Sequence, residues 1–149
     1  MEPSSACFDL IKRFEGCKLT AYQDPGGTWT IGYGHTGLEV KDGMSITQPW
    51  AEWYLKQDVK KAASSVYSLT IPLELTQGQL DALVSFVYNL GAGAFESSTL
   101  RRLLLNGSPE LAADEFLKWV HMKEGDDEVV AQGLLDRRRA ERALFLEAS

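Results

Sequence analysis

The segment at residues 80–90 constrains the fold more than any other part of the sequence. It follows a capping box, with Thr76 as the N-cap residue and Gln79 at the third helical position. Its apolar side chains cover most of the circumference of a helix: Leu80, Leu83, Val84, Phe86, Val87 and Leu90. A helix with this pattern has to be enclosed by other elements. We therefore expect a mostly helical protein built around one buried helix.

The N-terminal part of the chain combines one helix with short strands. Residues 5–15 have the spacing of an amphipathic helix, and Gly16 is a natural end for it. Strands are expected at residues 19–22 and 28–33, on either side of the turn Asp24-Pro25-Gly26-Gly27.

Most of the remaining chain has helical patterns. A long helix is expected after the N-cap residue Thr47, with Pro49 in its first turn. Further helices are expected at residues 98–105, 108–120 and 134–146, with loops at 68–75 and, inside the polar stretch 121–132, at 125–127.

These elements predict an α+β, mostly helical fold in a single domain of residues 1–149. A chain of 149 residues can bury about two-thirds of its unfolded surface, which is enough for one core. A β-rich lobe is expected at residues 14–46 and a helical lobe at 47–149, packed with the N-terminal helix. The long helix would join the two lobes.

Charge and hydropathy narrow the range of partners. The formal net charge of -6 disfavours nucleic acid, because phosphate binding needs a basic surface. The basic run Arg137-Arg138-Arg139 is the local exception, and its simplest interpretation is a solvated helix face. No apolar run reaches the roughly 18 residues of a membrane helix. We therefore expect neither a signal peptide nor stable membrane insertion.

The two cysteines, Cys7 and Cys17, do not have the spacing of a zinc site. Two free thiols are expected, with a disulfide as the alternative if the helix end brings them together. Neither metal nor cofactor is expected.

Two carboxylates in residues 14–35 have the surroundings of an acid and a base. Glu15 lies at a helix C-terminus, where the negative end of the helix dipole and the neighbouring Phe14 favour a neutral acid. Asp24 lies in a polar turn that suits a charged base, and the Thr30 hydroxyl can hold a water. An ordinary Asp-Pro-Gly turn and an ordinary helix end remain the alternative explanation.

Motifs along the chain resemble the phage-type lysozymes, glycoside hydrolase family 24. The signature consists of Phe14-Glu15-Gly16, Asp24 and Thr30-Ile31-Gly32-Tyr33-Gly34-His35. Residues 76–91, 98–100, 112–119 and 133–145 are similar to segments of the lambdoid-phage endolysins. The resemblance implies a lysozyme-like fold, and a muramidase that cleaves the β-1,4 bond between N-acetylmuramic acid and N-acetylglucosamine during phage-induced host lysis.

The resemblance also implies roles for individual residues. Glu15 falls on the general acid, Asp24 on the base or electrostatic stabiliser, and Thr30 on the residue that positions water, with inversion as the favoured outcome. Four residues match positions that line the substrate cleft, although each has a structural alternative: His35, Tyr88, Asn89 and Trp119. Either Arg137 or Arg138 is expected to hold Glu15.

The family further implies a monomer that acts on peptidoglycan strands. It would stay in the host cytoplasm until a separate holin lets it reach the periplasmic wall. The sequence departs from the family in the acidic run 125–128 and in Asp136. Two alternatives remain open, a catalytically silent wall-binding module and a relative that cleaves chitin or chitosan.

Overall fold

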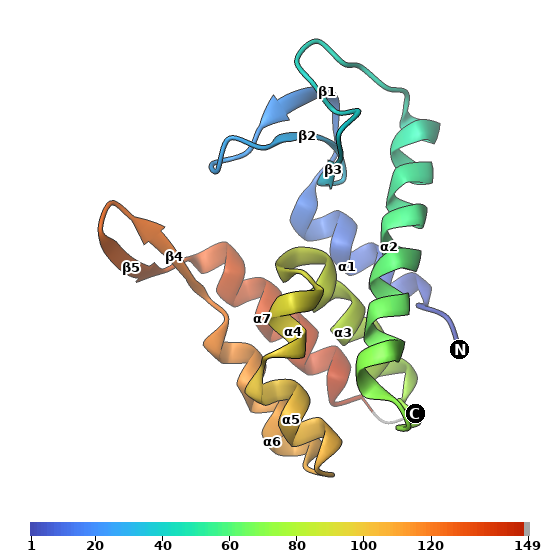
Figure 1. The fold of residues 1–149 in the computed structure, drawn as a ribbon, viewed down its shortest axis with the longest axis vertical. Helices are drawn as coiled ribbons and strands as arrows, with labels where there is room; N and C mark the ends of the chain where they lie inside the picture. Colours follow the sequence, from blue (N-terminus) through green and yellow to red (C-terminus); the bar gives the residue numbers. More distant parts are fainter. Residues whose placement is uncertain (148–149) are drawn as a thin grey trace.

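A small β lobe and a larger helical lobe, joined by a long helix, make up the computed structural model, which describes residues 1–147 (Figure 1). The joining helix is α2 (Gln48–Thr70), whose N-cap Thr47 accepts a hydrogen bond from the Trp50 amide. A loop was expected from Ser68, but the helix continues to Thr70. Thr70 is buried, and its hydroxyl donates to the Val66 carbonyl at 2.8 Å, which stabilises the last turn.

The β lobe contains a three-stranded antiparallel sheet in the order β1-β2-β3. The expected strands are β1 (Lys18–Gln23) and β2 (Trp29–Gly32), and a two-residue strand β3 (His35–Thr36) adds to them. The register pairs Tyr22 with Thr30. Because Asp24 begins the turn after β1, this register brings it to the same end of the hairpin as Thr30.

The helical lobe is built around α3 (Gln77–Leu90), whose residues 80–87 are all buried. The capping box formed by Thr76 and Gln79 is present, and the expectation of a central buried helix is confirmed. Helices α1 (Ser5–Glu15), α2 and α7 (Gln132–Phe145) pack against it. The shorter helices α4 (Ala92–Glu96), α5 (Thr99–Leu105), α6 (Pro109–Glu115) and the 3-10 turn η1 (Phe116–Lys118) complete the lobe.

An exposed β-hairpin projects from the helical lobe between η1 and α7 (Figure 1). Its strands are β4 (His121–Glu124) and β5 (Asp127–Val130), which were not expected, and the turn between them lies in the loop expected at residues 125–127. Gly125, with φ of 65°, opens a two-residue turn of the kind that requires glycine first. Nearly every hairpin residue is exposed, so no burial alternation marks the strands in the sequence.

Both cysteines are free thiols, with Cys7 buried in α1 and Cys17 exposed after it. Burial, followed by the charges of Asp81 and Glu141, raises the pKa of Cys7 to about 12, which leaves it unreactive near neutral pH. Among residues 1–147, no helix combines the length and the hydropathy needed to cross a bilayer.

Candidate active site

Glu15 is the last residue of α1, and its side chain lies against the backbone of Gly34. The helix ends there because Gly16 has φ of 66°, with its amide bonded to the Lys12 carbonyl at 3.0 Å. Gly34 has φ of 79°, and a Cβ atom on it would lie 2.5 Å from Oε1 of Glu15. The glycine is therefore required twice, by its backbone conformation and by its close approach to the carboxylate.

Arg137 of α7 holds the same carboxylate from the other side. Its Nη1 atom lies 2.7 Å from Glu15 Oε2, and its side chain is only 4% exposed. Its Nη2 atom donates to the Ser85 carbonyl of α3 at 3.2 Å. Glu15 thus sits between the β lobe and the helical lobe, with its two oxygens in contact with different elements.

Arg138 does not contact Glu15 but belongs to the buried network behind it. Its Nη2 atom donates to Asn89 Oδ1 at 2.6 Å, and its Nε atom lies 2.9 Å from Glu141 Oε1 as an ion pair. Ser85 donates its hydroxyl proton to Glu141 Oε2 at 2.6 Å. Burial lowers the pKa of Arg138 to about 10 and raises that of Glu141.

This network corrects the interpretation of the basic run as a solvated helix face. Arg137 and Arg138 are buried on the α3 side of α7, and only Arg139 is exposed. Glu141, which sequence analysis missed, is fully buried with them. Glu141 follows Arg138 by three positions and Arg137 by four, which places its side chain near both on a helix. This spacing was the signal available in the sequence.

Asp24 and Thr30 lie at the open end of the β1–β2 hairpin. Asp24 Oδ1 accepts the Thr28 amide at 2.8 Å, so the aspartate both shapes the turn and has a fixed orientation. The Thr30 hydroxyl donates its proton to the Thr28 carbonyl at 2.9 Å. Because that proton is engaged, Thr30 can only accept a hydrogen bond from a water molecule.

Tyr22 lies near both carboxylates and was not found from the sequence. Burial, followed by the negative charges of Glu15 and Asp24, raises the pKa of Tyr22. Both carboxylates are therefore close enough to affect this phenol. Its pairing with Thr30 across the hairpin places Tyr22 among the same residues.

His35 belongs to strand β3, and its contacts give it a structural role. Its Nδ1 atom is 2.6 Å from Asp58 of α2, its Nε2 atom is 2.7 Å from Glu39, and its ring stacks on Tyr54 at 4.0 Å. Burial lowers the pKa of His35, but the hydrogen bonds to Asp58 and Glu39 outweigh burial and the net effect raises it. The side chain is only 8% exposed, so the structural alternative fits it better than a place in the cleft.

The other three expected cleft residues have different surroundings. Trp119 is half-buried at the edge of the core, where it packs edge-on against Phe86 at 5.5 Å. Asn89 is held by Arg138. The Tyr88 hydroxyl donates to the Tyr33 carbonyl, which directly precedes Gly34, and this side chain lines a groove.

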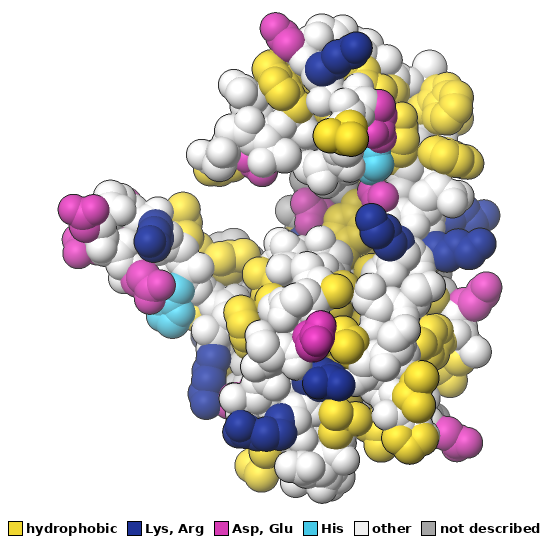
Figure 2. All heavy atoms as spheres, viewed as in Figure 1, with side chains coloured by type: hydrophobic (Ala, Val, Ile, Leu, Met, Phe, Trp, Pro, Cys, Tyr) yellow, Lys and Arg dark blue, Asp and Glu magenta, His cyan; other side chains and the backbone are white. Residues whose placement is uncertain are grey.

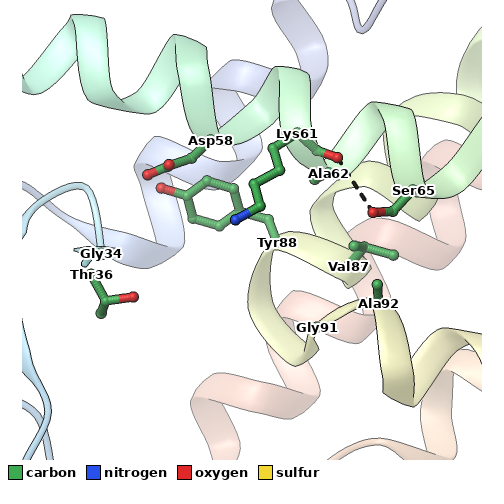
Figure 3. A pocket seen from close by; sticks show the side chains of 10 residues that line it. All are labelled: Gly34, Thr36, Asp58, Lys61, Ala62, Ser65, Val87, Tyr88, Gly91 and Ala92. Carbon is green, nitrogen blue, oxygen red and sulfur yellow. Dashed lines mark hydrogen bonds between the residues drawn. The ribbon is translucent and has the colours of Figure 1, made fainter. Parts of the chain in front are cut away.

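The groove has a volume of about 350 Å³ and lies between the two lobes. Gly34 and Thr36 line it from the β lobe, Asp58 and Lys61 from α2, and Val87 and Tyr88 from α3 (Figure 3). Figure 2 shows an open hollow below the β lobe, between that lobe and the β4–β5 hairpin at the lower left. Gly34, against which Glu15 packs, belongs to the wall of the groove.

Known proteins are similar in sequence to nearly the whole of this chain. The family model for phage lysozyme matches residues 12–141. The endolysin of Acyrthosiphon pisum secondary endosymbiont phage 1 is 43% identical, over 93% of this chain and 94% of its own. The endolysin of Salmonella phage P22 is also 43% identical, over 98% of this chain and 99% of its own.

Solved structures agree with these sequence matches. The muramidase domain of SpmX from Asticaccaulis excentricus superposes with a TM-score of 0.91 at 37% identity, with 99% of both chains covered. The fold, the motifs and the family match all lead to one assignment: the chain belongs to the phage lysozyme family.

Proposed function

We propose that the protein is a muramidase endolysin, which hydrolyses the β-1,4 bond between N-acetylmuramic acid and N-acetylglucosamine in peptidoglycan. The observation that carries this proposal is the position of Glu15, held by Arg137 at 2.7 Å and packed against Gly34 at the junction of the lobes. Asp24 and Thr30 lie on the neighbouring hairpin. The names of its relatives support the same activity.

In the proposed mechanism, Glu15 gives its proton to the glycosidic oxygen that leaves. Asp24 and Thr30 orient the attacking water, which donates one hydrogen bond to each of them and presents a lone pair to the anomeric carbon. As the new C–O bond forms, Asp24 takes up one water proton and the other stays on the new hydroxyl group. The Asp24 charge also stabilises the oxocarbenium-like transition state. Attack by water from the far side of the sugar inverts the anomeric configuration.

The role of Glu15 is tested by the Glu15→Gln variant, which keeps the shape of the side chain but cannot donate an acid proton. We expect lysis of chloroform-treated Gram-negative cells, followed by turbidity, to fall by about 10²–10⁴-fold. The matched control is Glu74→Gln, at an exposed position in the loop before α3. Equal clearing by Glu15→Gln and the wild type would exclude this mechanism.

The product identifies the bond that is cut. Mass spectrometry of the released muropeptides should show muramic acid at the reducing end. Release without this end group would contradict a muramidase, and wall binding without any release would point to the silent binding module. Cleavage of chitin oligosaccharides at a comparable rate would instead favour the chitin-cleaving alternative.

The stereochemistry tests the role of water. Proton NMR of freshly cleaved strands should show the α anomer first, because inversion converts a β bond into an α product. Initial formation of the β anomer would instead indicate a covalent intermediate.

We further propose that the protein is a monomer that waits in the host cytoplasm and depends on a holin to reach the periplasmic wall. The endolysin names of the relatives support action on the cell wall. Expression in a Gram-negative host with and without a co-expressed holin tests it, since lysis should follow only when the holin is present. Light scattering after size-exclusion chromatography should give the 16.5 kDa mass of one chain.

A further inference from the structure

The groove between the lobes begins at the proposed acid and extends away from it along α2. Gly34 belongs both to the wall of this groove and to the contact with Glu15 Oε1. The Tyr88 phenol lies in the groove beside Asp58 (Figure 3), and the charges of Asp58 and Glu15 both act on it. A sugar next to the bond that is cut would therefore extend into this groove. Its volume of about 350 Å³ lies within the range of about 300–1,000 Å³ for small-ligand sites.

The charge of the groove differs from that of the whole protein. Lys61 extends from α2 toward the groove and supplies the one cation among its described lining residues (Figure 3). The one acidic lining residue, Asp58, is engaged with His35 at 2.6 Å. Within residues 1–147, Lys61 has no carboxylate at ion-pair distance. A protein of net charge -6 thus presents a free ammonium group beside its proposed active site.

The rest of the lining suits an N-acetylated sugar. Ala62 and Ala92 are small and apolar, so they leave room for a sugar ring and an acetyl methyl group. Thr36 and Ser65 add hydroxyls that can bond to sugar oxygens. Peptidoglycan differs from chitin in the lactyl ether on muramic acid. The carboxyl group of this ether is either free or extended by a peptide that bears carboxylates, so a carboxylate is present in both cases.

We propose that this groove binds the muramyl sugar, with the Lys61 ammonium group pairing with a carboxylate on its lactyl or peptide substituent. Lys61 is then a specificity-determining residue that favours peptidoglycan over chitin. This inference rests on the proposed function, since it assigns the substituent recognised at the same site. The lactyl and the peptide carboxylates share one chemistry, and the ligands of the test separate them.

The test compares Glu15→Gln with Glu15→Gln/Lys61→Met, so that ligands bind without being cleaved. Three ligands are titrated by calorimetry: peptide-bearing glycan fragments, the same fragments with peptides removed by an amidase, and chitin oligosaccharides of equal length. Methionine keeps the length of the side chain and removes its charge. We expect affinity for carboxylate-bearing ligands to fall about fivefold, as for one ionic contact in an open groove, and affinity for chitin oligosaccharides to stay the same.

The pattern of loss identifies the carboxylate. A loss on peptide-bearing fragments alone assigns the stem peptide, a loss on stripped fragments alone assigns the lactyl group, and a loss on both means that either pairs with Lys61. An equal loss on all three ligands, or no loss on any, overturns the proposal. If the contact is ionic, the difference in affinity between the two variants should also become smaller as the salt concentration is raised.

Two further variants serve as a control and as a rescue of the Lys61 charge. Lys60→Met removes the neighbouring charge, which lines a separate groove beside Met1 and Phe8, and should leave all three affinities unchanged. Lys61→Arg should restore binding of the carboxylate-bearing ligands. Because binding is measured without turnover, failure of this inference is separate from failure of the proposed function, which would appear as a wild type that releases no muramic acid ends.

Discussion

At the scale of single residues, Gly34 shows why the motif around β2 and β3 needs a glycine at that position. Its backbone has φ of 79°, and its missing side chain leaves the space that Glu15 Oε1 occupies. Gly43 has a similar φ of 85° but faces open space, so a Cβ atom there would meet nothing within 4 Å. A comparison of substitutions at the two glycines therefore distinguishes the effect of backbone strain from the effect of contact with the proposed acid.

We predict that Gly34→Ala lowers the rate of muropeptide release by at least about tenfold, because the new methyl group displaces the Glu15 carboxylate. Gly43→Ala should lose about 1 kcal/mol of unfolding free energy from the same backbone strain but keep its activity. Thermal unfolding and release rates measured on both variants check this. Equal activity losses in the two variants would show that strain alone is responsible.

Arg137 is the second residue on which the position of Glu15 depends. Arg137→Lys keeps a positive charge but cannot contact Glu15 and the Ser85 carbonyl together, as the planar guanidinium does. We predict a fall in kcat of about tenfold or more with a small change in KM. Arg139→Lys, at the exposed neighbouring position, is the control. Full lytic activity in Arg137→Lys, Arg137→Ala and Arg138→Ala would mean that neither arginine positions Glu15.

At the scale of elements, the contact between α3 and α7 fixes the position of these arginines. A Cβ atom on Gly78 would overlap the carbonyl oxygen of Leu144, which is backbone and cannot rotate away. We predict that Gly78→Ala destabilises the protein by about 1–3 kcal/mol, measured by urea unfolding. Gly133→Ala adds the same methyl group to a helix where nothing lies within 4 Å, and should be neutral or slightly stabilising. Equal stability of the two variants would contradict this close packing.

The elements also differ in how well the sequence predicts them. The capping box of Thr76 and Gln79 and the helix end at Gly16 were predictable because their signals are local. The β4–β5 hairpin was missed because it is exposed on both faces, so hydrophobic alternation does not mark it.

The proposed site shows the same division between local and long-range signals. Glu15, Asp24 and Thr30 lie within 16 positions of one another and were found from a motif. The burial of Arg137 and Arg138 was missed because α7 is rich in charged residues. The groups that neutralise and bind these arginines come partly from α3, at Ser85 and Asn89, and no local pattern reveals such partners.

At the scale of the whole molecule, His35 ties the two lobes together. It belongs to β3, and its Nδ1 atom pairs with Asp58 of α2 at 2.6 Å. Burial opposes charge on His35, but Asp58 and Glu39 outweigh it, so its pKa in the folded state is raised above the usual 6.5. The stabilisation is therefore fully present below that usual value and is lost as pH rises through the raised pKa.

We predict that His35→Gln destabilises the protein more at pH 6 than at pH 9, since the wild type loses the ionic contribution in between. Urea unfolding of both proteins at each pH measures the difference. His121→Gln, on the exposed strand β4, is the matched control and should show little effect at either pH. A loss of stability that is independent of pH would mean that His35 contributes by packing and neutral hydrogen bonds alone.

The pair formed by Glu15 and Arg137 joins residues 122 positions apart in the chain. A ribosome therefore makes the proposed acid well before the arginine that holds it. An interrupted polypeptide that stops before α7 has Glu15 without its partner, and the buried face of α3 is left open. We therefore expect copies that stop before α7 to lack lytic activity, so that lytic activity accumulates only after α7 has been made and has packed against α3.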